Sequence, residues 1–199
     1  MKCRLAFTFH TPPTHFSSGH PAVNPLYGRG VRIFLKTLDK TKETNKKTGH
    51  EYIGYKTNCQ TCVATYIARR KGYDVRALPN VNNNNIANLS FNTTLAYIDQ
   101  NGNHPKQKRI SSINDIAFDM KPNSIYAVRF DYVGRSSGHI VIVEKEKSGR
   151  VFLYDPQSNR TTDQANFKNY AKGKTNFNAM DLTNVSLDEK YCDKIMKRR

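Results

Sequence analysis

Three residues of types that can cooperate in nucleophilic catalysis lie far apart in the chain: Cys59, His139 and Asp155. Cys59 precedes a stretch with helical spacing of apolar residues, which places it in the first turn of a helix. Unpaired backbone N–H groups and the positive end of the helix dipole favour a thiolate there. A thiolate nucleophile, an imidazole acid–base and a carboxylate that orients the imidazole together perform acyl transfer.

The two later residues are expected to meet at one end of a β-hairpin. His139 follows Gly138 at the start of an apolar strand, and Asp155 ends the next strand. Counting outward from the turn at Lys147–Gly149 brings the start of one strand beside the end of its partner. The nucleophile on an early helix and the base and its orienter on later strands follow the papain-like order.

The elements that must position these residues can be predicted from local patterns. Thr57 or Asn58 caps a helix that has a stripe of Val63, Tyr66 and Ile67 and stops at Gly72. A short helix is expected over 111–118, and Ser186 to Glu189 is a capping-box pattern that opens a last helix with Leu187, Tyr191 and Ile195 on one face. The predicted strands are Tyr73–Leu78, Ser124–Val133, Gly138–Lys145 and Arg150–Asp155, with a loop at Asn82–Asn85.

The order of these elements predicts one α+β domain with its main helix first and its sheet afterwards. Residues 1–50 are expected to form an irregular segment with a lysine-rich insertion, apart from a short element at Val31–Leu38. Residues 51–199 are expected to form the catalytic domain.

The Cys59–Cys62 pair has other interpretations. Cys62 lies one turn deeper in the helix and is the alternative nucleophile, although the position of Cys59 at the helix start favours Cys59. A zinc site would need two further ligands at suitable spacing, and Cys3, Cys192 and the scattered histidines provide no second close pair. A redox Cys-x-x-Cys motif should follow a strand of a βαβ unit, which this one does not. We therefore expect no metal and no cofactor.

The chain is strongly basic, with 32 Lys and Arg against 16 Asp and Glu in 199 residues, a formal net charge of +16. Such a charge would suit a nucleic acid or an acidic protein partner, such as a neutralising inhibitor. The basic residues are dispersed and form no known nucleic-acid-reading element, so we do not expect a nucleic-acid partner. No apolar run reaches the length of a membrane span, and the N-terminus lacks a signal-peptide pattern.

Several motifs together resemble the papain-fold toxin domains described as glutamine deamidases, which occur in bacterial polymorphic toxins and phage head-morphogenesis proteins. The first motif runs from Asn58 to Val63 as Asn-Cys-Gln-Thr-Cys-Val, and an upstream Asn24-Pro-Leu-Tyr27 resembles the family's lead-in. Gly138-His139 and Tyr154-Asp-Pro-Gln157 match later motifs. The resemblance covers roughly residues 20–160, and the chain departs from the family in a long insertion, the Asn-rich loop and the absence of Trp.

The resemblance implies a papain-like cysteine enzyme fold, with the nucleophile helix packed on a small antiparallel sheet. It implies that Cys59 attacks a protein glutamine, that His139 gives the departing ammonia its proton, and that Asp155 orients His139. The Cys59 N–H and a side chain, Asn58 or Gln157, would bind the oxyanion. The expected setting is the cytoplasm of a target cell, with an acidic immunity protein as partner. A cysteine peptidase and a basic nucleic-acid-binding accessory protein are the alternatives, and the same thioester also permits transamidation.

Overall fold

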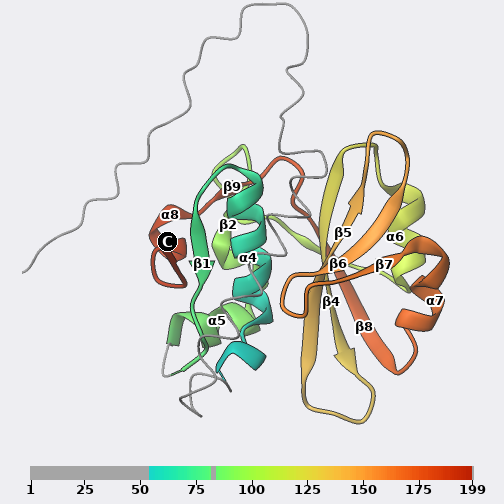
Figure 1. The fold of residues 1–199 in the computed structure, drawn as a ribbon, viewed down its shortest axis with the longest axis horizontal. Helices are drawn as coiled ribbons and strands as arrows, with labels where there is room; N and C mark the ends of the chain where they lie inside the picture. Colours follow the sequence, from blue (N-terminus) through green and yellow to red (C-terminus); the bar gives the residue numbers. More distant parts are fainter. Residues whose placement is uncertain (1–53, 82–83, 199) are drawn as a thin grey trace, which may run out of the picture.

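The computed structural model describes residues 54–81 and 84–198 and is built around a six-stranded antiparallel sheet (Figure 1). The sequence segments predicted for residues 1–50, including Val31–Leu38, lie outside the described residues. The strand order of the sheet is β3-β8-β4-β5-β6-β7. In that order the strands are β3 (Gln107–Arg109), β8 (Lys174–Asp181), β4 (Ser124–Tyr132), β5 (Gly138–Lys145), β6 (Val151–Asp155) and β7 (Arg160–Asp163).

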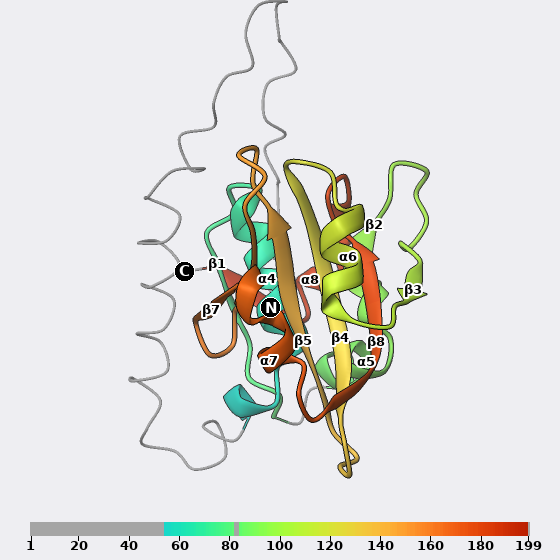
Figure 2. The same cartoon turned by 90° about the vertical axis from the view of Figure 1, so that its right-hand side faces the viewer.

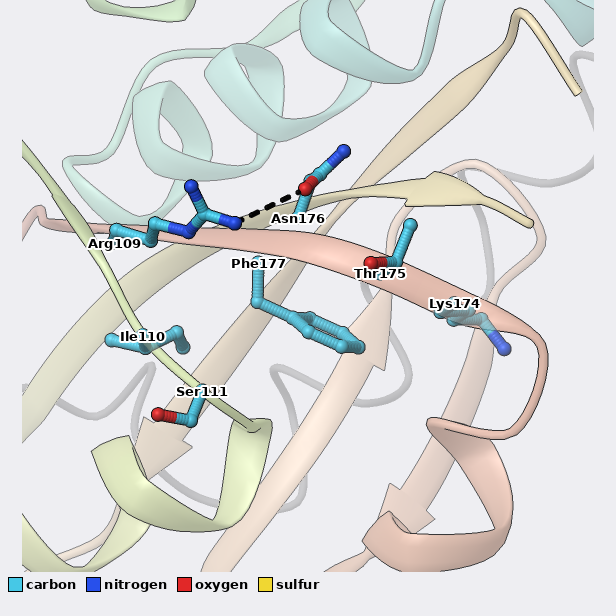
Figure 3. Close-up of a pocket in the computed structure, with 7 residues that line it drawn as sticks. All are labelled: Arg109, Ile110, Ser111, Lys174, Thr175, Asn176 and Phe177. Carbon is cyan, nitrogen blue, oxygen red and sulfur yellow. Dashed lines mark hydrogen bonds between the residues drawn. The ribbon is translucent and has the colours of Figure 1, made fainter. Parts of the chain in front are cut away.

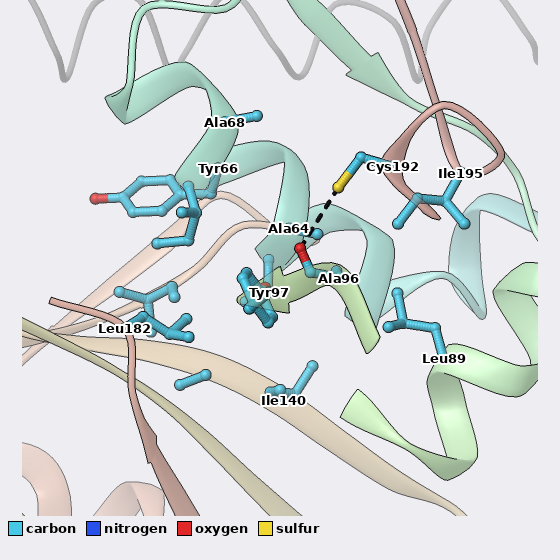
Figure 4. Packing of buried hydrophobic residues seen from close by; sticks show 14 of the residues in the cluster. Ala64, Tyr66, Ala68, Leu89, Ala96, Tyr97, Ile140, Leu182, Cys192 and Ile195 are labelled. Atoms are coloured by element: carbon cyan, nitrogen blue, oxygen red, sulfur yellow. Dashed lines mark hydrogen bonds between the residues drawn. The ribbon is translucent and has the colours of Figure 1, made fainter. Parts of the chain in front are cut away.

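Helix α4 (Cys59–Arg70) covers one face of this sheet (Figure 1). Its predicted stripe is buried: Val63 is 0% exposed, and Tyr66 and Ile67 are each 2% exposed. They pack with Ile140 and Ile142, because every second side chain of β5 faces α4. Figure 4 shows this core from close by, between α4, the sheet and the C-terminal residues Cys192 and Ile195. The predicted antiparallel sheet with a helix packed on it is therefore present.

The opposite face is covered by two short helices, α6 (Ile113–Asp119) and α7 (Phe167–Tyr170), which lie in front of the sheet in Figure 2. The predicted helix over 111–118 is thus confirmed, and it starts at a capping box formed by Ser112 and Asp115. The remaining elements are β1 (Val75–Ala77), α5 (Asn84–Phe91), η2 (Thr93–Ala96), β2 (Tyr97–Ile98), η3 (Gln164–Asn166), β9 (Ser186–Leu187), α8 (Glu189–Cys192) and β10 (Met196–Arg198).

Two local predictions are wrong. Asn84 and Asn85 do not belong to a loop but open α5, because Ile86 and Leu89 bury one face of that helix in the core. The pattern Ser186 to Glu189 does not act as a capping box. Ser186 and Leu187 pair with β2 as strand β9, and Asp188 caps the short α8 instead, accepting from the Tyr191 backbone N–H. Here tertiary pairing overrides a weak local signal.

Strands β3, β7 and β8 were not predicted. Strand β8 is central, since it pairs with both β3 and β4, yet Asn176 and Asn178 and its charged ends hide its strand character. No helix within residues 54–81 and 84–198 is both long and apolar enough to cross a bilayer.

A buried ion pair ties α4 to β5. Arg70 Nη1 lies 2.8 Å from Glu144 Oε2 and 3.0 Å from Oε1, and the Tyr66 hydroxyl donates to the same carboxylate. The Glu144 side chain is 6% exposed and the Arg70 side chain 13%. Because α4 carries Cys59, this contact helps fix the helix on the strand that carries His139.

Replacing Glu144 with Leu is expected to lower the free energy of unfolding by about 3 kcal/mol, because it removes the carboxylate that the largely buried Arg70 charge contacts. The double variant Glu144→Leu/Arg70→Leu should regain part of that loss. Urea denaturation measures both, with Glu146→Gln on the neighbouring turn as the control. A loss no larger for Glu144→Leu than for Glu146→Gln would contradict the assignment.

Candidate active site

Cys59 is the first residue of α4, as predicted. Asn58 precedes it at the N-cap position, but its side chain does not cap the helix. Instead the Asn58 amide is 1% exposed and donates from Nδ2 to the Leu78 carbonyl oxygen at 2.8 Å. The backbone N–H groups of the first helical turn are consequently not occupied by a cap, and they surround the partly exposed Cys59.

The structure brings His139 and Asp155 into direct contact. His139 Nε2 lies 3.0 Å from Asp155 Oδ2, and their side chains are 11% and 14% exposed. Asp155 is held in turn by the loop that follows it: the Gln157 backbone N–H donates at 2.9 Å and the Ser158 hydroxyl at 2.6 Å. Ser158 was not predicted as part of the site. An Asp followed three residues later by a Ser was the available signal, since such pairs form side-chain turns.

Gly138 is required by the close approach of β4. A Cβ atom at this position would lie 2.5 Å from the Phe130 carbonyl oxygen and 2.8 Å from Asp131 Oδ1. Any side chain would therefore push the start of β5 away from β4, and His139 would move with it. The Gly-His pair in the sequence thus has a steric explanation.

Cys59 also contacts His139. Burial lowers the pKa of His139, but side-chain hydrogen bonds to Asp155 and Cys59 and the charges of both outweigh burial and raise the pKa to about 9. Burial likewise raises the pKa of Asp155, while its hydrogen bonds to His139, Ser158 and the Gln157 backbone bring it below the ordinary value. These contacts favour the protonated form of His139, with the ionised Asp155 carboxylate beside it.

Asn58 and Gln157 are brought together beside the nucleophile. Gln157 Nε2 donates to the Tyr55 carbonyl oxygen at 3.1 Å and to Asn58 Oδ1 at 3.2 Å. These bonds connect the loop after Asp155 to the segment that leads into α4. Because both amide nitrogens donate to protein oxygens in this structure, an oxyanion-binding role for either side chain stays a prediction.

Cys62 lies one turn along α4 from Cys59, and its thiol donates to Asn58 Oδ1 at 3.4 Å. Cys59, Cys62 and Cys192 are all free thiols, and Cys3 lies outside the described residues. Within 54–81 and 84–198, no three His, Cys, Asp or Glu residues gather in an arrangement that could hold a metal ion.

An aromatic cluster that sequence reasoning missed adjoins His139. The Phe130 ring meets the His139 ring edge-on, with centroids 5.8 Å apart, and also contacts the rings of Tyr132 and Tyr170. Burial, followed by the charges of Asp155 and Cys59, raises the pKa of Tyr132, so its hydroxyl stays protonated beside the site. Aromatic residues spread over strand β4 and the distant short helix α7 give no recognisable sequence motif.

A cavity of about 480 Å³ adjoins this cluster through Lys174, on the β8 side of the sheet (Figure 3). Figure 3 shows the side chain of Lys174 turned away from Arg109. Neither Cys59, His139 nor Asp155 lines this cavity, so it is separate from the site described above. Its lining residues are Arg109, Ile110, Ser111, Lys174, Thr175, Asn176 and Phe177.

Comparison with known proteins gives one family match. Residues 57–160 match the family described as papain fold toxin 1, glutamine deamidase. The matched segment is just over half of the 199-residue chain and runs from the residue before Asn58 to beyond Gln157, so it includes Cys59, His139 and Asp155. No curated protein sequence matches the chain.

Proposed function

Because the chain belongs to the papain fold toxin 1, glutamine deamidase family, we propose that it converts glutamine side chains of a target protein to glutamate. We propose Cys59 as nucleophile, His139 as acid–base and Asp155 as the residue that orients His139. The observation that carries this proposal is the chain of contacts from Cys59 through His139 to Asp155, with a His139–Asp155 distance of 3.0 Å. A papain-like arrangement of these groups is part of the proposal.

In the first half of the reaction the Cys59 thiolate attacks the carbon of the glutamine carboxamide. A tetrahedral intermediate forms, and its negative charge lies on the former carbonyl oxygen. When this intermediate collapses, the C–N bond breaks, and His139 gives its proton to the departing nitrogen so that ammonia leaves. The product is a thioester between Cys59 and the glutamyl side chain.

In the second half water hydrolyses the thioester. His139, now neutral, takes a proton from the water molecule while the water oxygen attacks the thioester carbon. The C–S bond then breaks, which releases glutamate and restores the thiolate beside the imidazolium. Asp155 keeps the imidazole in the tautomer and orientation that both halves need, because its carboxylate is fixed by Gln157 and Ser158.

The oxyanion is expected to bind at the start of α4. The backbone N–H of Cys59 lies in the uncapped first turn, where the N–H groups have no intrahelical acceptor and the helix dipole favours negative charge. We propose that Asn58 and Gln157 support this geometry: their mutual hydrogen bond joins the segment before α4 to the Asp155 loop.

The proposal is tested by peptide-level mass spectrometry of proteins from cells that express the wild-type chain or Cys59→Ala. Deamidation makes a glutamine peptide heavier by about 1 Da, and this change should occur at particular glutamines only with the wild type. New peptide ends in place of the mass change would instead indicate a peptidase. The proposal would be contradicted if cells that contain the folded wild type showed neither the mass change nor new peptide ends.

We further propose that the protein acts inside a target cell and is neutralised by an acidic immunity protein. The net charge of +16 supports an acidic partner through long-range attraction.

A further inference from the structure

Lys174 lies inside the aromatic cluster next to His139. In the register of the sheet Phe130 is opposite His139, and Tyr132 is opposite Lys174 two residues further along β4. The Lys174 ammonium is 4.2 Å from the Tyr170 ring centroid, 5.4 Å from that of Phe130 and 6.0 Å from that of Tyr132. It also donates to the Tyr170 carbonyl oxygen. The charge is thus held in a fixed place beside the site.

A second cation lies over the ring of Tyr132. The Arg135 guanidinium lies 5.8 Å from the Tyr132 ring centroid, at the exposed tip of the β4–β5 hairpin. Among the residues that the structure describes, neither Lys174 nor Arg135 forms an ion pair, whereas Arg70, Arg129 and Arg150 each do. Two positive charges beside the Tyr132 ring therefore lack an ion-pair partner among the described residues.

The surroundings of Lys174 strengthen its attraction for an anion. Burial lowers the pKa of Lys174, because the rings around it exclude water from part of its surface. A partly desolvated ammonium interacts more strongly with a carboxylate than one in bulk water does. Two of its three N–H donors remain for a ligand after the bond to Tyr170.

We propose that Lys174 and Arg135, presented by Tyr132, form a subsite for the carboxylate of an Asp or Glu near the target glutamine. This inference rests on the proposed function. Lys174 and His139 both contact the ring of Phe130, at 5.4 Å and 5.8 Å from its centroid. In an extended substrate a residue two or three positions from the glutamine lies about 7 to 10 Å along the chain, a distance that two groups on one ring can span.

Three synthetic peptides test the subsite, with binding and turnover measured in separate experiments. Each peptide has one central glutamine, flanked by Glu, by Ala or by Lys at positions two and three on either side. Fluorescence polarisation with the Cys59→Ala chain measures binding without turnover, and ammonia release by the wild type measures the reaction. We expect the Glu-flanked peptide to bind about tenfold more tightly than the Ala-flanked one.

Lys174→Met/Arg135→Gln, made in the Cys59→Ala chain, should remove most of this tenfold preference. Binding of the Ala-flanked peptide should change less than about twofold. The matched control is Lys121→Gln/Lys147→Gln, which removes the same charge at the opposite end of the sheet. Arg135→Gln alone changes an exposed position and should leave the fold intact. Circular dichroism of each variant shows whether a loss of binding comes from the subsite or from unfolding.

Equal binding of the three peptides, including no detectable binding of any, would overturn the proposed subsite. An equal loss in the control double variant would also overturn it, because the preference would then come from net charge alone. A preference for the Glu-flanked peptide without ammonia release from any peptide or protein would contradict the proposed function and leave the subsite standing.

Discussion

Replacing Cys59 with alanine is expected to lower the deamidation rate by at least about 10⁴-fold, because the substitution removes the thiol that would form the thioester. Peptide binding and the free energy of unfolding should change little, since Cys59 is partly exposed and packs only against the edge of the core. Ammonia release and urea denaturation of the purified chain measure the two effects.

Cys62→Ala is the matched control for this prediction. The Cys62 thiol donates a weak bond to Asn58 Oδ1, at 3.4 Å, and it is not among the groups that shift the pKa of His139. We expect Cys62→Ala to keep the rate within about threefold of the wild type. A full rate in Cys59→Ala together with a lost rate in Cys62→Ala would reverse the assignment of the nucleophile.

Replacing Asp155 with asparagine is expected to lower kcat by about 10³-fold while KM changes little. The amide cannot stabilise the imidazolium, and it can hold His139 in the wrong tautomer. Steady-state ammonia release measures both constants. The control is Asp163→Asn, which removes a 62% exposed carboxylate on the neighbouring strand β7 and should leave both constants unchanged.

The pH profile distinguishes an electrostatic role of Asp155 from a merely structural one. His139 must carry a proton when ammonia leaves, and its pKa of about 9 means that the wild-type rate falls only as the pH rises through about 9. Asp155→Asn removes one of the charges that raise this pKa, so the alkaline fall should move to lower pH. An unchanged alkaline limb in Asp155→Asn would contradict the electrostatic role.

The same shift predicts how folding stability depends on pH. The folded-state pKa of His139 is raised above the ordinary value of 6.5, so its contribution to stability is complete below pH 6.5 and is lost as the pH rises through about 9.

The three residues proposed for catalysis could be chosen from the sequence because each has a strong local signal. Cys59 opens a helix with a clear apolar stripe, and the turn between two apolar strands sets the register that brings His139 to the end of the sheet near Asp155. The residues around them had no such signal. Lys174 and Tyr170 come from β8 and α7, which were not predicted, so their approach to Tyr132 depends on long-range pairing.

The fold was predictable where hydrophobic periodicity is strong and unpredictable where pairing decides. Strand β5 begins and ends as predicted, since Ile140 to Val143 form a continuous apolar run. Strand β8 contains polar residues through most of its length and becomes a strand only because β3 and β4 flank it. Strand β9 and helix α8 show the same effect at the C-terminal end, where pairing with β2 competes with a helix-start pattern.

The central claim is that Cys59 forms a thioester with the target glutamine, and mass spectrometry of the acid-quenched enzyme tests it most directly. The wild-type chain is mixed with a glutamine-containing protein found to be converted in cells, quenched within seconds and digested. We predict a Cys59 peptide that is heavier by the mass of the substrate fragment less that of ammonia, and no such peptide from Cys59→Ala. Conversion of the glutamine with Cys59 unmodified at every time point, and at full rate in Cys59→Ala, would contradict the claim.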